Sequence, residues 1–351
     1  MVHVAEIITT LTNAVGLSGN ENQIHELIKT YFAPLVDEVS ISKVGSVIGV
    51  KWGGAPLQNA SRAKRLMLAA HLDEIGMIVS GIEKEFLRIA RVGGTDARIM
   101  LGQRVLVHPA GRRDGKGPHA GVIASRPPHV LPADKRDKVV GFDDLFVDIG
   151  LTAAQVAREI QVGDLVSFDV ETVKLRGDLL TGKAMDDRAA VATMIVCLDE
   201  LQRLKHGWDV VAVATAGEET SFAGATTSTY AIQPDAAIAI DVTFANQHDY
   251  SSHVELGKGP AIAVGPNYHP KLRKRLIDVA KRLDMGYQIE PDIGGGTDAW
   301  PIQISRSGVP TAQLGLPLRY MHSPVETVNI KDVERVGRLM AHFAAELAEE
   351  I

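Results

Sequence analysis

The chain has 351 residues, of which 45% are hydrophobic and 23% charged, so it is long enough to form two domains with substantial cores. Its formal net charge of −6 gives no electrostatic footprint for nucleic acid or an anionic membrane, and we expect neither as a partner. The single cysteine excludes an internal disulfide, and no basic segment followed by a long apolar core opens the chain, so we expect a cytoplasmic protein.

The first seventy residues predict helices followed by strands. A helix begins near Val4, and a second one is opened by the segment Ser18 to Glu21. Strand-like segments follow at Val39 to Ile41, Val47 to Lys51 and Arg65 to Ala70. The last of these is an apolar run that ends directly at a histidine.

That histidine, His71, is followed two residues later by Asp73. Alternation along a strand places residues i and i+2 on one face, so Asp73 can orient His71 as a metal ligand. Taken alone, such a pair is more often a structural hydrogen bond than a metal site. Further acidic and histidine residues downstream, each next to an apolar strand or a helix start, favour the metal interpretation.

The middle of the chain has a different texture. Between Ile75 and about Leu180, short strand-like pieces are separated by turns rich in glycine and proline, which predicts a small all-β barrel. The clearest pieces are Gly76 to Gly81, Phe86 to Ala90, Arg104 to His108 and Leu165 to Val170. We expect this insertion to contribute at most residues adjacent to His71 to the chemistry, and its strand edges to be covered by another subunit.

From residue 180 onward, strands and helices alternate, which predicts a mostly parallel sheet with helices on both faces. Helices are expected at Arg188 to Leu204, Pro270 to Leu283 and Ile330 to Glu350, and strands at Val210 to Ala214, Ala236 to Ile240, Ala261 to Val264 and Thr311 to Leu314. The predicted fold class is therefore α/β with an inserted all-β domain. Residues 1–73 and 180–351 would form one catalytic domain, and residues 74–179 the insertion.

Ligands in open α/β sheets gather at the carboxyl ends of strands, and the candidate residues follow such ends. His71, Glu218, Glu219, Asp241 and His322 can therefore share one crevice. Asp186, at the start of the helix near Arg188, is the natural carboxylate to bridge two ions. Asp187 is expected to cap that helix or to bind its backbone. Of the neighbours Glu218 and Glu219, one can bind metal while the other acts as general base.

Several motifs resemble the M42 family of dinuclear metallo-aminopeptidases, in colinear order over nearly the whole chain. They are residues 71–76 (HLDEIG), 182–188 (GKAMDDR), 217–219 (GEE), Asp241, 294–299 (GGGTDA) and 319–324 (RYMHSP). The resemblance implies one metal held by His71 and Asp241 and a second by Glu219 and His322, with Asp186 bridging. It also implies Glu218 as the base and Asp73 as the carboxylate that orients His71.

The remaining expectations concern ligands and assembly. Two divalent ions per subunit are expected, Zn²⁺ or Co²⁺ with Mn²⁺ as a further candidate, because imidazole and carboxylate ligands accept all three. The glycine-rich segment would let a peptide backbone approach, which makes Gly295, Gly296, Thr297 and Asp298 candidate substrate-binding residues. The resemblance also implies a PDZ-like or barrel-like insertion used in dimerisation, and a tetrahedral dodecamer that encloses its active sites.

The site chemistry predicts a two-metal hydrolase, and the resemblance implies removal of N-terminal residues from short peptides. Two alternatives stay open. A glycoside hydrolase would need two carboxyl groups flanking a sugar bond but no histidines at metal-ligand positions. A non-catalytic metal-binding scaffold would not need Glu218 beside a complete ligand set.

Overall fold

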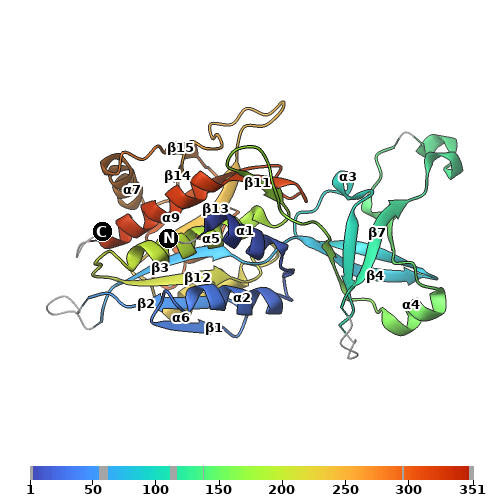
Figure 1. Cartoon of the computed structure of the whole chain (residues 1–351), viewed down its shortest axis with the longest axis horizontal. Coiled ribbons are helices and arrows are strands. Elements are labelled where there is room, and N and C mark those ends of the chain that lie inside the picture. Colours follow the sequence, from blue (N-terminus) through green and yellow to red (C-terminus); the bar gives the residue numbers. More distant parts are fainter. Residues whose placement is uncertain (1–2, 55–61, 111–116, 137, 295, 348–351) are drawn as a thin grey trace.

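The computed structural model describes residues 3–54, 62–110, 117–136, 138–294 and 296–347. It has two parts, a large α/β domain and a small barrel that projects from one end of it (Figure 1). The chain enters the barrel after His71 and returns to the α/β domain after Phe168. The predicted fold class, an α/β domain with an inserted all-β barrel, is confirmed.

The α/β domain is built on a sheet of 11 strands within the described residues. Its centre is parallel, in the order β12-β3-β13-β16, and this centre is flanked by the antiparallel pairs β2-β12 and β16-β17. The strands are β1 (Glu38–Ile41), β2 (Val47–Lys51), β3 (Arg65–His71), β10 (Val173–Lys174), β11 (Leu179–Gly182), β12 (Asp209–Thr215), β13 (Ala236–Phe244), β14 (Ala261–Val264), β15 (Gln288–Pro291), β16 (Thr311–Arg319) and β17 (Glu326–Asn329).

Both faces of this sheet are covered by helices, because successive side chains of the central strands alternate between two apolar cores. In β3, Leu66, Leu68 and Ala70 join the core under one set of helices, whereas Met67 and Ala69 join the core on the other face. The first set is α1 (Val4–Asn13), α2 (Asn22–Phe32), α5 (Met185–Leu201), α7 (Pro270–Arg282) and α9 (Ile330–Ala345). The second is α6 (Ala223–Ile232) and α8 (Ala299–Gln303).

The barrel closes in the order β4-β5-β8-β7-β6-β9 and has its own apolar core. Its strands are β4 (Gly76–Glu83), β5 (Phe86–Val92), β6 (Arg104–His108), β7 (His119–Ser125), β8 (Leu145–Asp148) and β9 (Leu165–Phe168). The helices α3 (Ala97–Met100) and α4 (Ala153–Glu159) lie between strands, as do three 3₁₀ turns at Pro128–Val130, Ala133–Lys135 and Phe142–Asp144. Because the barrel closes on itself, the expectation that its strand edges need cover by another subunit is wrong.

Several helices differ from the sequence expectation; α5, for example, spans Met185–Leu201 rather than Arg188 to Leu204. The final helix ends at Ala345 rather than continuing to Glu350, which lies outside the described residues. Helix α6 was not expected, because its sequence AGATTSTYAI is rich in threonine and has no clear apolar face. No helix among the described residues is both long and apolar enough to cross a membrane.

Candidate active site

The parallel centre of the sheet brings the candidate residues to one edge. His71 is the last residue of β3 and pairs in register with Thr215, the last residue of β12. The turn after β12 carries Glu218 and Glu219, and Asp241 lies on β13, two residues beyond Ala239, the last residue of β13 that pairs with β3. His322 follows β16. Because neighbouring parallel strands end at the same edge of a sheet, these segments, far apart in the sequence, converge there.

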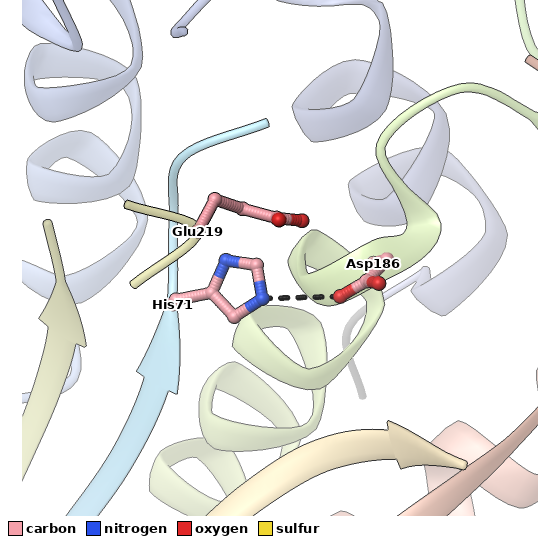
Figure 2. A group of neighbouring side chains, drawn as sticks. All are labelled: His71, Asp186 and Glu219. Carbon is pink, nitrogen blue, oxygen red and sulfur yellow. Dashed lines mark hydrogen bonds and ion pairs between the residues drawn. The ribbon is translucent and has the colours of Figure 1, made fainter. Parts of the chain in front are cut away.

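Asp186 lies between the two histidines and contacts each with a different oxygen. Its Oδ1 is 3.0 Å from His71 Nε2, and its Oδ2 is 3.3 Å from His322 Nε2. His322 Nε2 is also 3.4 Å from Oε1 of Glu219. In Figure 2, His71 from the end of β3, Asp186 from the start of α5 and Glu219 from the turn after β12 point toward one another. A carboxylate in this position can serve two ions at once.

Asp73 connects His71 to the turn that carries the two glutamates. Its Oδ1 lies 3.5 Å from His71 Nδ1 and accepts a 3.0 Å hydrogen bond from the backbone N–H of Glu218. Its Oδ2 accepts from the backbone N–H of Glu219 at 3.2 Å and from the Ser18 hydroxyl. The backbone oxygen of Asp73 also lies 3.2 Å from His71 Nδ1. A single buried side chain therefore fixes both the imidazole and the glutamate turn.

The neighbouring carboxylate, Asp187, does not cap helix α5, contrary to expectation. Asp186 and Asp187 have non-helical backbone angles, and the helix has no side-chain cap. Instead, Asp187 Oδ2 accepts a 3.1 Å hydrogen bond from the backbone N–H of His71. Ligand atoms of His71, Asp187 and Asp241 lie within 4.8 Å of one another, so this carboxylate also faces the site.

The packing of acidic groups perturbs their protonation strongly. Burial raises the pKa of Glu218 to about 10. The negative charges of Asp241, Asp298 and Glu219 also raise it, whereas the charge of His71 lowers it. Burial likewise raises the pKa of Asp241 well above its usual range, as does the charge of Asp186. Hydrogen bonds to Asp186 and Glu219 raise the pKa of His322 to about 11. The site lacks positive charge for the number of carboxylates it buries.

The donor set fits divalent cations. Imidazole nitrogens and carboxylate oxygens are the ligands that Zn²⁺, Co²⁺ and Mn²⁺ accept. Among the described residues, Asp187 Oδ1 and Glu218 Oε1 are buried without a hydrogen-bond partner. Ligand atoms of His71, Asp186 and Glu219 lie within 4.8 Å of one another. Buried acceptors that have no donors are what a cation site presents before it is filled.

Comparison with protein families gives a match over most of the chain. Residues 53–339 match the family model described as M42 glutamyl aminopeptidase. The chain belongs to the M42 peptidase family. It is therefore an aminopeptidase, a hydrolase that acts on peptides.

Individual relatives resemble this M42 chain in sequence or structure over almost its whole length. A lysyl aminopeptidase of Pyrococcus furiosus is 34% identical over 97% of this chain and 97% of its own. The TET aminopeptidase of the Thaumarchaeota archaeon SCGC AB-539-E09 has a TM-score of 0.91 and 33% identity, covering 99% of this chain and 97% of its own. The TET1 peptidase of Pyrococcus horikoshii, which can assemble into a tetrahedron or a large octahedral shell, has a TM-score of 0.84 and 29% identity, covering 98% and 100%.

One buried acid of the M42 site was missed by the sequence analysis. Glu326, the first residue of β17, accepts the backbone N–H of His322 at 2.8 Å and that of Asp186 at 3.1 Å. Burial and the charge of Asp186 raise the pKa of Glu326 well above its usual value. Its position four residues after His322 is the only sequence signal, and a single acidic residue at a strand start is too common to single out.

The barrel of the M42 chain also reaches the site, beyond the residues adjacent to His71. Gly94, in the loop after β5, lines the same cavity as the candidate ligands. Its neighbour Gly93 has a φ of +75°, and a Cβ built there would lie 3.0 Å from Glu219 Oε2. The expectation that the insertion contributes at most residues adjacent to His71 is therefore wrong, because the loop after β5 folds back over the carboxyl edge of the large sheet.

The candidate substrate-binding residues take different positions. Gly296 and Thr297 line a cavity of about 530 Å³ together with the candidate ligands. Gly295 lies outside the described residues. Asp298 is buried and is not among the cavity-lining residues; its Oδ2 accepts a hydrogen bond from the Thr215 hydroxyl. Thr297 donates to Gln313 at 2.7 Å, so its hydroxyl belongs to the cavity wall.

Proposed function

We propose that this chain is a dinuclear metal-dependent aminopeptidase that removes N-terminal residues from short peptides. The observation that carries the proposal is the placement of Asp186, whose two oxygens face His71 and His322 separately. In this proposal, His71 and Asp241 would hold one ion, Glu219 and His322 the other, and Asp186 would contact both. When bound, two such ions supply Lewis acidity at the scissile carbonyl and lower the pKa of water.

Glu218 is the proposed general base. It is buried at the cavity wall, its Oε1 has no hydrogen-bond partner among the described residues, and its Oε2 is 4.0 Å from His71 Nε2. In that position its carboxylate can take a proton from the attacking water and deliver it to the leaving amine. Asp73 supports this role by holding the backbone N–H of Glu218.

Substrate hydrolysis with and without chelator tests the function. We expect the protein to cleave aminoacyl-anilides and short peptides, to lose this activity with chelator, and to regain it with Zn²⁺, Co²⁺ or Mn²⁺. N-terminally acetylated versions of the same peptides are the matched control, and they should resist cleavage. Equal cleavage of blocked and free peptides would refute an aminopeptidase, and activity that survives complete metal removal would refute the metal site.

The two alternatives make different predictions in the same assay. A glycoside hydrolase would release sugar from cellulosic substrates. The structure does not favour this alternative, because the histidines that contact Asp186 have no part in glycoside hydrolysis. A scaffold would bind metal without turnover. The position of Glu218, with an unpaired oxygen beside the ligand set, favours catalysis over a scaffold.

We further propose that the chain forms dimers and a closed homo-oligomer of twelve subunits, as the tetrahedral assembly of the TET1 relative suggests. An enclosed site would favour short, unfolded peptides over intact proteins. Light scattering on the metal-loaded protein should give the mass of twelve chains of 37.7 kDa. A monomer at micromolar concentration would contradict this assembly.

A further inference from the structure

The cavity extends past the candidate ligands to two carboxylates that neither metal binding nor catalysis uses. Glu290 is on β15 and Asp292 follows that strand, and both line the cavity of about 530 Å³ that also contains His71 and Glu218. Thr243 and Gln313 line the same end of the cavity. This end is therefore continuous with the reaction centre.

Glu290 is held in a defined position relative to the metal-site candidate Asp241. Its Oε1 accepts the Thr243 hydroxyl, and Thr243 is two residues beyond Asp241 on the same face of β13. A Cβ built on Gly315 would lie 2.7 Å from Glu290 Oε2, and Gly315 is the register partner of Asp241 on β16. The Glu290 carboxylate thus lies between the residue two positions after Asp241 on β13 and the register partner of Asp241 on β16.

Gly315 explains why this position is open to a carboxylate, because any larger residue would occupy the space of Oε2. That oxygen is buried and has no hydrogen-bond partner among the residues that the structure describes. Burial and the charge of Asp292 raise the pKa of Glu290, whereas the hydrogen bond from the Thr243 hydroxyl lowers it. The carboxylate therefore lacks a donor or a cation beside Oε2.

The wall around Asp292 is fixed by a short hydrogen-bond chain. The Tyr268 hydroxyl contacts Asp292 Oδ2 and lies 3.0 Å from Gln313 Oε1, which also accepts from Thr297 at 2.7 Å. Tyr268 and Gln313 are buried. The Tyr268 and Thr297 hydroxyls are thus turned toward acceptors within the wall, and the charged side chains of this wall, Glu290 and Asp292, are both acidic.

The balance of charge in the cavity indicates what this end accepts. Two divalent ions would offset Asp186, Glu218, Glu219 and Asp241, which leaves Glu290 and Asp292 uncompensated. No lysine or arginine is among the described residues that line the cavity. Phe244 and Met321 contribute apolar surface to the same wall. A side chain with an apolar stem and a terminal positive charge matches this arrangement, whereas a carboxylate would be repelled.

We infer that this end of the cavity is the subsite for the side chain of the N-terminal residue and that it selects lysine or arginine, with Glu290 as the main charge partner and Asp292 as the second. The inference rests on the proposed function. A lysine has a flexible four-carbon stem before its ammonium group, which can extend from the reaction centre toward Glu290. The preference is opposite in charge to the glutamyl specificity in the description of the family model.

Kinetics on aminoacyl-anilides test the selectivity. We expect kcat/KM to be about tenfold or more higher for lysyl and arginyl than for leucyl substrates, and lowest for glutamyl substrates. Glu290→Gln should lower kcat/KM for the lysyl substrate by about 10- to 100-fold and leave the leucyl value within about threefold. Asp292→Asn should have a smaller effect in the same direction. The control is Glu255→Gln, an exposed acid that is not part of the cavity lining.

Calorimetry gives a second measurement that does not need turnover. The metal-loaded protein should bind L-lysine about tenfold more tightly than L-norleucine, which lacks the ammonium group, and Glu290→Gln should remove the difference. If no peptide is cleaved, the proposed function fails and this binding comparison still decides the inference. If leucyl or glutamyl substrates are cleaved faster than lysyl ones, or lysine and norleucine bind equally, the inference is overturned while the aminopeptidase stands.

Discussion

Gly94 of the barrel lies directly against the imidazole of His322 in the α/β domain. A Cβ built on Gly94 would overlap the Nδ1 and Cε1 atoms of that ring. Only a residue without a side chain lets the barrel loop come this close, so the loop forms one wall around a candidate metal ligand. The two domains therefore meet at the reaction centre.

Gly94→Ala should displace His322 and impair the site without unfolding the barrel. We expect loss of metal from the site and a fall in kcat of at least about 10-fold, since a shift near 1 Å in a positioned group can cost ~10² in rate. Gly141→Ala is the matched control in the barrel, because nothing lies within 4 Å of a Cβ there. Metal analysis and kinetics on both variants measure the effect; identical behaviour of the two would show that His322 tolerates the shift.

Glu326→Gln should weaken the site although Glu326 contacts neither ion in the proposed scheme. An amide can replace only one of the two acceptor oxygens, so the N–H of either Asp186 or His322 loses its partner. Loss of such supporting contacts typically costs about 10- to 100-fold in metal affinity. Titration of the metal-free protein with Zn²⁺ gives the affinity, with Glu334→Gln on α9 as the control. Unchanged affinity in Glu326→Gln would remove this positioning role.

The sequence was sufficient for those site residues that depend on strand ends. The apolar run before His71 and the alternation of strands and helices after residue 180 predict a parallel sheet, and such sheets place ligands at their carboxyl edge. That physical rule holds regardless of loop detail. It places His71, Asp241 and His322 together without any knowledge of side-chain contacts.

The sequence was insufficient where the role depends on contacts between distant segments. Glu326 acts on the backbone of Asp186, 140 residues away, through the pairing of β17 with β11. Gly94 matters only because the barrel loop folds back onto His322. Asp187 follows Asp186 at a helix start and so predicts a cap, but the backbone there is not helical and the carboxylate reaches His71 instead.

Asp186→Ala should reduce metal content more than loss of either histidine. The Asp186 carboxylate faces both proposed ions, whereas His71 and His322 each serve one. We therefore expect purified Asp186→Ala to hold close to no metal, and His71→Ala or His322→Ala to keep about one equivalent per chain. Elemental analysis decides the matter. Two equivalents in Asp186→Ala would exclude bridging by this residue and make Asp187 the candidate.

Glu218→Gln should retain both ions and the fold but lose turnover. In the proposed scheme Glu218 completes neither ligand set, and a general base contributes about 10²- to 10⁴-fold to rate. The measurement is kcat on a good substrate together with metal content and the circular dichroism spectrum. Near-normal turnover in a fully metallated variant would exclude Glu218 as the base and leave Glu219 to be tested in the same way.

A buried ion cluster beside the site should make stability depend on Glu74. Its Oε2 accepts from Lys183 Nζ at 2.7 Å, and its Oε1 accepts from Gly16 N–H at 2.9 Å and from Arg188 at 3.3 Å. Arg188 also donates to the backbone oxygens of Leu72, Leu11, Ala14 and Gly16. The cluster thus ties α1 and the segment after it to the end of β3.

Glu74→Gln should lower the free energy of unfolding by about 3–5 kcal/mol at neutral pH, because Lys183 would be left buried without its carboxylate partner. Burial alone would raise the pKa of Glu74. The charges of Lys183 and Arg188, with hydrogen bonds from Lys183 and the Gly16 N–H, outweigh burial, so the pKa lies below its usual 4.5. The folded state therefore binds this proton less readily than the unfolded state. The contribution of Glu74 is complete above pH 4.5 and is lost as the pH falls through the lower folded-state pKa.

Urea unfolding of the wild type and Glu74→Gln at a series of pH values measures this dependence. The difference between them should be constant from pH 7 down to about pH 5 and should shrink below that, since acid then protonates the wild-type carboxylate and removes its advantage. Glu26→Gln, at an exposed acid of α2 that pairs with the exposed Lys29, should stay within about 0.5 kcal/mol of the wild type throughout. A difference that grows on acidification would mean that the Glu74 carboxylate is not stabilised by its two cations.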